Sequence, residues 1–109
     1  MKKRPKTPAE RAHTDKIRNE RIAIAGGKCE WTGKRVPTQM HHICDADWYG
    51  RLKSERWIES VRMLGEEAHT GQLKHECIPA LRREFDLFLR GKGYTDEVIR
   101  EITGRKLYI

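Results

Sequence analysis

The feature that most constrains the fold is a helix whose two ends are both encoded locally, in "TPAERAHTDKIRNERIAIAGG". Thr7 can cap this helix, Pro8 suits its first position, and Glu10 completes a capping box three residues after the cap. Gly26 and Gly27 favour a stop, because glycine readily adopts the left-handed conformation that ends many helices. The first folded element is therefore predicted to be a long helix.

One face of this helix is predicted to pack on the rest of the chain, because apolar and neutral residues recur at helical spacing. The residues on this stripe are Ala9, His13, Ile17 and Ile24. We interpret His13 as structural because it lies on this face. The outer face is expected to leave its arginines free for a partner. These arginines are Arg11, Arg18 and Arg21.

Short β-favouring segments follow the helix and are separated by turn residues. Gly33 predicts the tight turn of a hairpin, and Pro37 makes the start of its second strand irregular. The segment "SVRML" is predicted as a further short strand. Residues 44–60 are polar with Trp48 and Trp57 embedded, so an ordered loop anchored by tryptophans is expected there.

The last third of the chain favours helices. "GEEAHTGQLKHE" begins with Gly65 and two acids, which suit the positive end of a helix dipole. Pro79 is predicted to occupy the first turn of a second helix, "PALRREFDLFLRG", which has one apolar face. The final helix, "TDEVIREITG", has Thr95 or Asp96 as its cap and Gly104 as its stop.

The length of 109 residues allows a single domain and is too short for two substantial cores. Positive charge is concentrated in residues 1–28, which hold nine lysines and arginines against three acids, whereas the other residues hold 14 against 13. Such a segment fits a polyanion such as the nucleic-acid backbone. It fits a solubilising tail as well.

The cysteines and the hydropathy pattern indicate in which cellular compartment the protein is expected. Cys29, Cys44 and Cys77 form no CxxC pair, and no apolar stretch follows the basic N-terminus. These features predict a reducing cytoplasm and cysteines that are buried thiols. No run approaches the length of about 18 apolar residues that spans a bilayer, so no membrane association is expected.

Three histidines are the strongest candidates for chemistry. His41 and His42 are adjacent in "TQMHHICDADWYG", and His69 follows the acids at the expected helix start. Imidazole binds borderline divalent metals and is also a natural general base near neutral pH. Consecutive strand residues point to opposite faces. The two adjacent histidines can therefore act on one phosphate only in two cases. Either the strand ends at this point, or a metal lies on one side of the phosphate and a water on the other.

The segment from about Cys29 to His75 resembles the His-Asn-His (HNH) endonucleases of the ββα-metal fold. "CEWTGKRVPTQMHHI" is similar to the hairpin that leads into the family's catalytic pair, and "SVRMLGEEAHTG" is similar to its strand, turn and metal-binding helix. The resemblance implies an α+β fold with a small ββα-metal core, flanked by a basic N-terminal helix and two C-terminal helices. The implied divisions are a basic arm and helix over 1–28, the core over 29–75 and a helical extension over 76–109.

The same resemblance assigns roles to particular residues. His42 would be the general base, His41 a metal ligand and His69 the metal ligand on the helix. Ser60 stands where the family has the asparagine that pins the loop and orients the base. Serine has a shorter reach and fewer donors than asparagine. His75 is a candidate extra ligand or phosphate contact, and apolar packing is expected in place of the zinc-binding CxxC pairs that many members carry.

The implied reaction is hydrolysis of DNA phosphodiester bonds, with products carrying a 5′ phosphate and a 3′ hydroxyl. His42 would activate water, and one divalent ion would stabilise the developing negative charge. Zinc, nickel, manganese and magnesium ions are all compatible with the ligands. Backbone contacts that carry little sequence information are expected from the basic segment. The residues expected to make them are Arg11, Arg18, Arg21 and Lys28.

Other interpretations of the sequence stay open at this point. A non-catalytic zinc-binding DNA module would use Cys29, Cys44, Cys77 and either His69 or His75 as four ligands. A helical adaptor of a phage assembly would explain the basic arm but not the histidines. For the nuclease, the alternatives include nicking or double-strand cleavage, a homodimer, and dependence on a larger phage DNA-processing protein in the cytoplasm of a bacterial host.

Overall fold

The computed structural model describes residues 7–43 and 57–109. These residues form an α+β arrangement of four α-helices, one 3-10 turn and a two-stranded antiparallel sheet. The elements, in chain order, are α1 (Pro8–Ala25), β1 (Thr38–His42), η1 (Ile58–Ser60), β2 (Val61–Gly65), α3 (Glu66–His69), α4 (Lys74–Gly91) and α5 (Asp96–Thr103). The expected N-terminal arm, Cys44 and Trp48 lie outside the described residues.

Helix α1 has the ends that its sequence predicts. The hydroxyl of Thr7 accepts the Glu10 amide at 3.2 Å, while the Glu10 carboxylate accepts the Thr7 amide at 2.9 Å. Gly26 ends the helix with φ at 64°, in the left-handed region. The predicted docking stripe is wrong apart from Ile17. The buried residues of α1 are Thr14, Ile17 and Arg21, whereas Ile24 is 58 % exposed.

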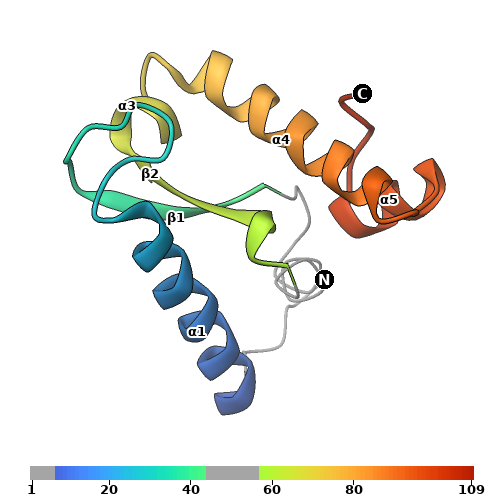
Figure 1. Cartoon of the computed structure of the whole chain (residues 1–109), viewed down its shortest axis with the longest axis horizontal. Coiled ribbons are helices and arrows are strands. Elements are labelled where there is room, and N and C mark those ends of the chain that lie inside the picture. The colour runs from blue at the N-terminus through green and yellow to red at the C-terminus, as the bar shows by residue number, and fades with distance from the viewer. Residues whose placement is uncertain (1–6, 44–56) are drawn as a thin grey trace, which may run out of the picture.

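The sheet pairs β1 with β2 in one register, with His41 opposite Arg62 and His42 opposite Val61. Figure 1 shows α1 on one side of this sheet and α4 on the other. Side chains alternate along each strand, and cross-strand partners share a face. Leu64 belongs to the core that includes residues of α4, so His41 and Arg62 lie on that face. His42 and Val61 lie on the face toward α1.

Gly33 forms a tight turn, as predicted, but the turn does not join two strands of a hairpin. The Cys29 amide donates to the Lys34 carbonyl, and the Gly33 amide donates to the Cys29 carbonyl, both at 2.9 Å. The next residue, Glu30, donates its amide to the Met63 carbonyl at 2.9 Å. The turn is therefore hydrogen-bonded to β2. The strand that pairs with β1 is also β2, which comes later in the chain.

The helix predicted from Gly65 stops after one turn, and the next helix starts before Pro79. Helix α3 ends at His69 and α4 begins at Lys74, so Pro79 lies inside α4. The amides of Thr70 and Gly71 both donate to the Glu66 carbonyl, at 2.9 and 2.7 Å. The chain thus folds back over α3 before the next helix begins. His69 therefore lies at the end of a separate short helix.

One core joins the sheet to the C-terminal helices. It contains Ile43 and Leu64 from the sheet region, Ala68 from α3, Cys77, Leu81, Phe85 and Leu89 from α4, and Ile99 from α5, together with Cys29. Trp57 packs on this core, as expected for a loop anchor, with its ring 6.3 Å from Phe85 and 5.9 Å from Tyr94. None of the helices in residues 7–43 and 57–109 is long and apolar enough to cross a bilayer.

Candidate active site

His41 and His69 are brought together by two different elements. His41 stands near the end of β1 and His69 at the end of α3, and the centroids of their rings are 5.2 Å apart with an angle of 67° between the ring planes. The Nε2 atom of His41 is shielded from solvent, and both side chains are partly buried. The fold therefore places two imidazoles from distant parts of the chain side by side.

The spacing of these rings fits two ligands of one metal ion. With metal–nitrogen bonds of about 2.1 Å and a tetrahedral angle, two imidazole centroids lie roughly 5 Å apart. The 5.2 Å separation of His41 and His69 agrees with this value. Within the described residues there is no group of three or more His, Cys, Asp or Glu side chains that could hold a metal.

His42 is the last residue of β1 and follows His41 directly. The strand ends at His42, and the next residue, Ile43, donates its amide to the Ser60 carbonyl at 2.9 Å. His42 is partly buried and lies on the opposite face of the strand from His41. The side chains of His41 and His42 therefore leave β1 in opposite directions.

Ser60 is buried where β2 begins, directly across from this strand end. Its hydroxyl donates to the Trp57 carbonyl at 2.8 Å, and its amide donates to the same carbonyl at 3.1 Å. The side chain therefore closes the η1 turn that leads into β2. This hydroxyl bond goes back along the chain to Trp57 and not across to β1.

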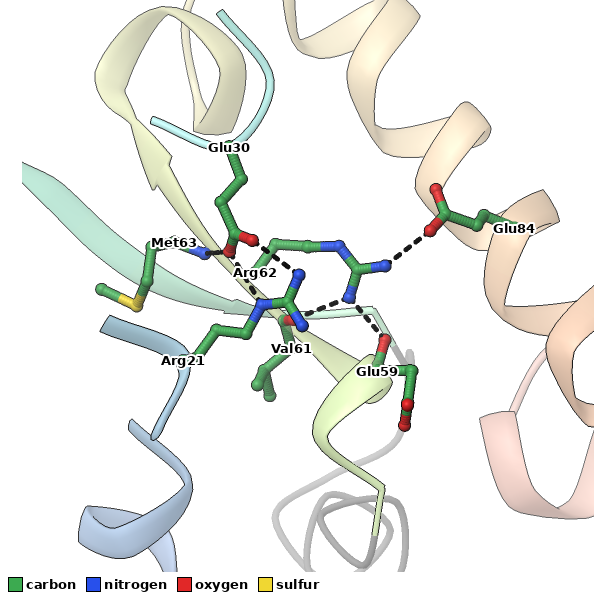
Figure 2. Close-up of polar contacts among 7 residues, drawn as sticks. All are labelled: Arg21, Glu30, Glu59, Val61, Arg62, Met63 and Glu84. Atoms are coloured by element: carbon green, nitrogen blue, oxygen red, sulfur yellow. Dashed lines mark hydrogen bonds and ion pairs between the residues drawn. The ribbon is translucent and has the colours of Figure 1, made fainter. Parts of the chain in front are cut away.

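A buried ion pair links α1 to the turn that precedes β1, as Figure 2 shows for Arg21 and Glu30. Arg21 donates from Nε and Nη2 to the two carboxylate oxygens of Glu30, at 2.9 and 2.6 Å. The same carboxylate accepts the Met63 amide at 2.7 Å. The expectation that Arg21 stays free on the outer surface is therefore wrong. Apolar packing was expected to hold the turn, and Cys29 does pack in the core with Leu64, but the charged contacts of Glu30 add to that packing.

The other basic candidates lie on the surface. Arg11, Arg18 and Lys28 are exposed, and Arg18 forms an exposed ion pair with Asp15 at 2.9 Å. His75 is also exposed and lies in the first turn of α4, not on the helix of His69. A groove of about 650 Å³ opens beside His69, between the turn at Lys34, the start of β1 and α3.

Cys29 and Cys77 are buried free thiols, as expected. Burial raises the pKa of Cys29, but hydrogen bonds from the Thr32 side chain and from the backbone amides of Thr32, Gly65 and Trp31 outweigh it, so the pKa of this thiol is lowered overall. Burial raises the pKa of Cys77 to about 11, and a negative charge on Cys29 adds to the rise. Both thiols belong to the hydrophobic core, and Cys29 also lines the groove beside His69.

Arg62 is the functional candidate that the sequence interpretation missed. It is buried in β2, opposite His41, and its Nη1 atom donates to the carbonyls of Glu59 and Val61 at 2.8 and 2.9 Å. The sequence feature that could have pointed to Arg62 is a single arginine inside the apolar run "VRML". A charge in a buried strand requires polar partners, and here those partners flank Ser60.

Comparison of the chain with protein-family models, with curated proteins and with solved structures finds no match. The function is therefore inferred from the geometry and chemistry of the described residues.

Proposed function

We propose that this chain is a metal-dependent endonuclease that hydrolyses phosphodiester bonds of DNA. In this proposal β1, β2 and α3 form a ββα-metal core of the HNH type. The observation that carries it is the convergence of His41 and His69, whose rings lie 5.2 Å apart. His42 follows His41 at the end of the same strand, and a pair of imidazole ligands with a further imidazole on the same strand is suited to metal-assisted hydrolysis.

His42 takes the role of general base. Imidazole accepts a proton readily near neutral pH, so His42 would remove a proton from the water that attacks phosphorus. The bond between phosphorus and the 3′ oxygen then breaks, and the departing oxygen takes a proton from solvent water, which leaves a 5′ phosphate and a 3′ hydroxyl. The backbone pairing of His42 with Val61 would hold the ring in position for this proton transfer.

His41 and His69 would hold the divalent ion. When bound, such an ion supplies positive charge to a nonbridging phosphate oxygen and to the leaving oxygen. Two nitrogen donors suit zinc, nickel or manganese, while magnesium would need several waters and the phosphate to complete its shell.

The DNA would be bound through its backbone. Arg11, Arg18 and Lys28 are exposed cations, and the arm before α1 adds further lysines and an arginine. Contacts of this type position a duplex but carry little sequence information. We therefore propose low sequence specificity, with cleavage of one or both strands by a monomer, by a homodimer or in company with a larger DNA-processing protein.

A plasmid assay tests this function. The protein is incubated with supercoiled plasmid and Mg²⁺, Mn²⁺, Ni²⁺ or Zn²⁺, beside His42→Ala, His41→Ala and a matched control, His13→Ala, whose histidine is exposed on α1. We expect nicking by the wild type and by His13→Ala, and a loss of about 10²-fold or more in His42→Ala, as for removal of a general base.

Calorimetric titration with metal separates the two histidine roles. We expect His41→Ala to lose metal binding and His42→Ala to keep it. Equal nicking by the wild type and His42→Ala, or no nicking with any of the metals, would overturn the proposal. A structural zinc module would instead copurify with one tightly held zinc ion.

A further inference from the structure

Arg62 is a buried cation in the middle of β2. Only 8 % of its surface is exposed, and its strand partner is His41. A charge removed from water is tolerated when its donors are hydrogen-bonded and a counter-charge is near. The hydrogen-bond partners of Arg62 therefore indicate which part of the structure its buried side chain stabilises.

The guanidinium of Arg62 divides its hydrogen bonds between backbone and carboxylate, as Figure 2 shows. Its Nη1 donates to the Glu59 carbonyl at 2.8 Å and to the Val61 carbonyl at 2.9 Å, while its Nη2 donates to the Glu84 carboxylate at 2.7 Å. The two carbonyls belong to the residues on either side of Ser60. One planar group thus fixes the backbone on both sides of that serine.

The backbone that Arg62 fixes is the pairing partner of the catalytic strand end. The Ser60 carbonyl accepts the Ile43 amide at 2.9 Å, and Val61 is paired with His42. Movement of this segment would shift the backbone of His42 and of the residue after it. The hydroxyl of Ser60 is already bonded to the Trp57 carbonyl, so it does not hold the segment against this movement.

We propose that Arg62 is a positioning residue that holds the backbone on both sides of Ser60 and thereby fixes the position of His42 on the paired strand. This inference rests on the proposed function, because it takes His42 as the general base whose position Arg62 fixes. Arg62 acts through the carbonyls of Glu59 and Val61. The Glu84 carboxylate is 62 % exposed, and an ion pair with such an exposed partner adds little, so it serves mainly to neutralise the guanidinium.

Three variants test this role: Arg62→Met, Arg62→Lys and Glu84→Gln. Arg62→Met should lower kcat for plasmid nicking by about 10²-fold, because small displacements of a catalytic group have effects of this size, while KM and metal affinity stay near wild type. Arg62→Lys should recover part of the rate, because an ammonium group can still reach a carbonyl. Glu84→Gln should keep nearly the full rate, because the carbonyl bonds remain.

Amide hydrogen exchange provides a measurement that does not depend on nuclease activity. The Ile43 amide should exchange faster in Arg62→Met than in the wild type, while amides in α5 stay protected, since that helix lies outside the network. If Arg62→Met does not fold, the same comparison is made with Arg62→Lys, in which a smaller loss of Ile43 protection is expected.

The outcomes separate the alternatives. A folded Arg62→Met enzyme with unchanged kcat overturns the inference, and so does a rise in KM alone, which would make Arg62 a phosphate contact. Faster cleavage by Glu84→Gln would also favour a phosphate contact and overturn it. If the wild type cleaves no DNA, the proposed function fails, and Ile43 exchange still decides whether Arg62 holds this segment: unchanged protection overturns the inference and reduced protection supports it.

Discussion

Gly71 is the residue that allows α3 to end at His69. A Cβ atom at this position would lie 2.8 Å from the Glu67 Cα and 3.0 Å from the Glu66 carbonyl oxygen, both of them backbone atoms. The chain can fold back closely over α3 only because glycine has no side chain. The position of His69 relative to His41 therefore depends on a residue that takes no part in the chemistry.

Gly71→Ala is expected to destabilise the protein by about 1–3 kcal/mol, as overpacking in a tight site does, and to weaken metal binding at His69. Gly91→Ala is the matched control, because a Cβ atom there meets nothing within 4 Å. The control should be neutral or stabilising by about 0.4–1 kcal/mol. Urea unfolding measures both variants, and equal stability of the two would contradict the close approach at Gly71.

At the scale of elements, the C-terminal segment is attached to α4 by a buried carboxylate. Asp86 is fully buried, and its Oδ2 accepts Arg105 Nη1 at 3.0 Å and the Tyr108 amide at 2.8 Å. Arg82 adds a bond of 2.7 Å to the Tyr108 hydroxyl. These bonds hold the residues after α5 against α4, the helix that contributes more residues to the core than any other element.

Asp86→Ala should cost about 3–5 kcal/mol, because removing one partner leaves the other charge buried without compensation. Arg90→Ala breaks the exposed pair with Asp96, whose side chains are about half exposed, and should cost at most about 1 kcal/mol. Thermal unfolding compares the two variants. A loss in Asp86→Ala no larger than that in Arg90→Ala would show that the buried pair contributes little.

At the scale of the whole molecule, the positive charge and the histidine site come from different parts of the chain. Helix α1 lies on the side of the sheet opposite α4 (Figure 1), and its buried Arg21 ties it to the turn that precedes β1. A polyanion bound to the exposed cations of α1 would therefore be held next to the sheet that carries His42.

Deletion of residues 1–6, which contain four lysines and arginines, should weaken DNA binding and flatten its salt dependence. For each phosphate that the protein no longer neutralises, the slope of log K against log salt becomes shallower by about 0.9. Fluorescence anisotropy with a labelled duplex at several salt concentrations measures this effect. An unchanged slope would remove the arm from DNA binding.

Local signals in the sequence were sufficient to predict the ends of α1 and α5, because a helix cap requires only residues within one turn. Thr7 with Glu10 and Thr95 both cap their helices as predicted. The start of α4 was predicted wrongly at Pro79, because proline favours a first turn but does not exclude a later position. The stripe of α1 was also predicted wrongly, since periodicity does not show where a contact surface begins and ends.

For the candidate site, the sequence by itself determined which side chains have the chemistry: His41, His42 and His69 are distinctive by residue type. Only the tertiary structure decided that His41 and His69 meet, that Arg21 turns inward to Glu30, and that Arg62 holds the backbone around Ser60. The physical reason is that a buried guanidinium is tolerated only where distant carbonyls and carboxylates converge on it. That convergence depends on how β1, β2, α1 and α4 pack, and no local pattern in the sequence encodes it.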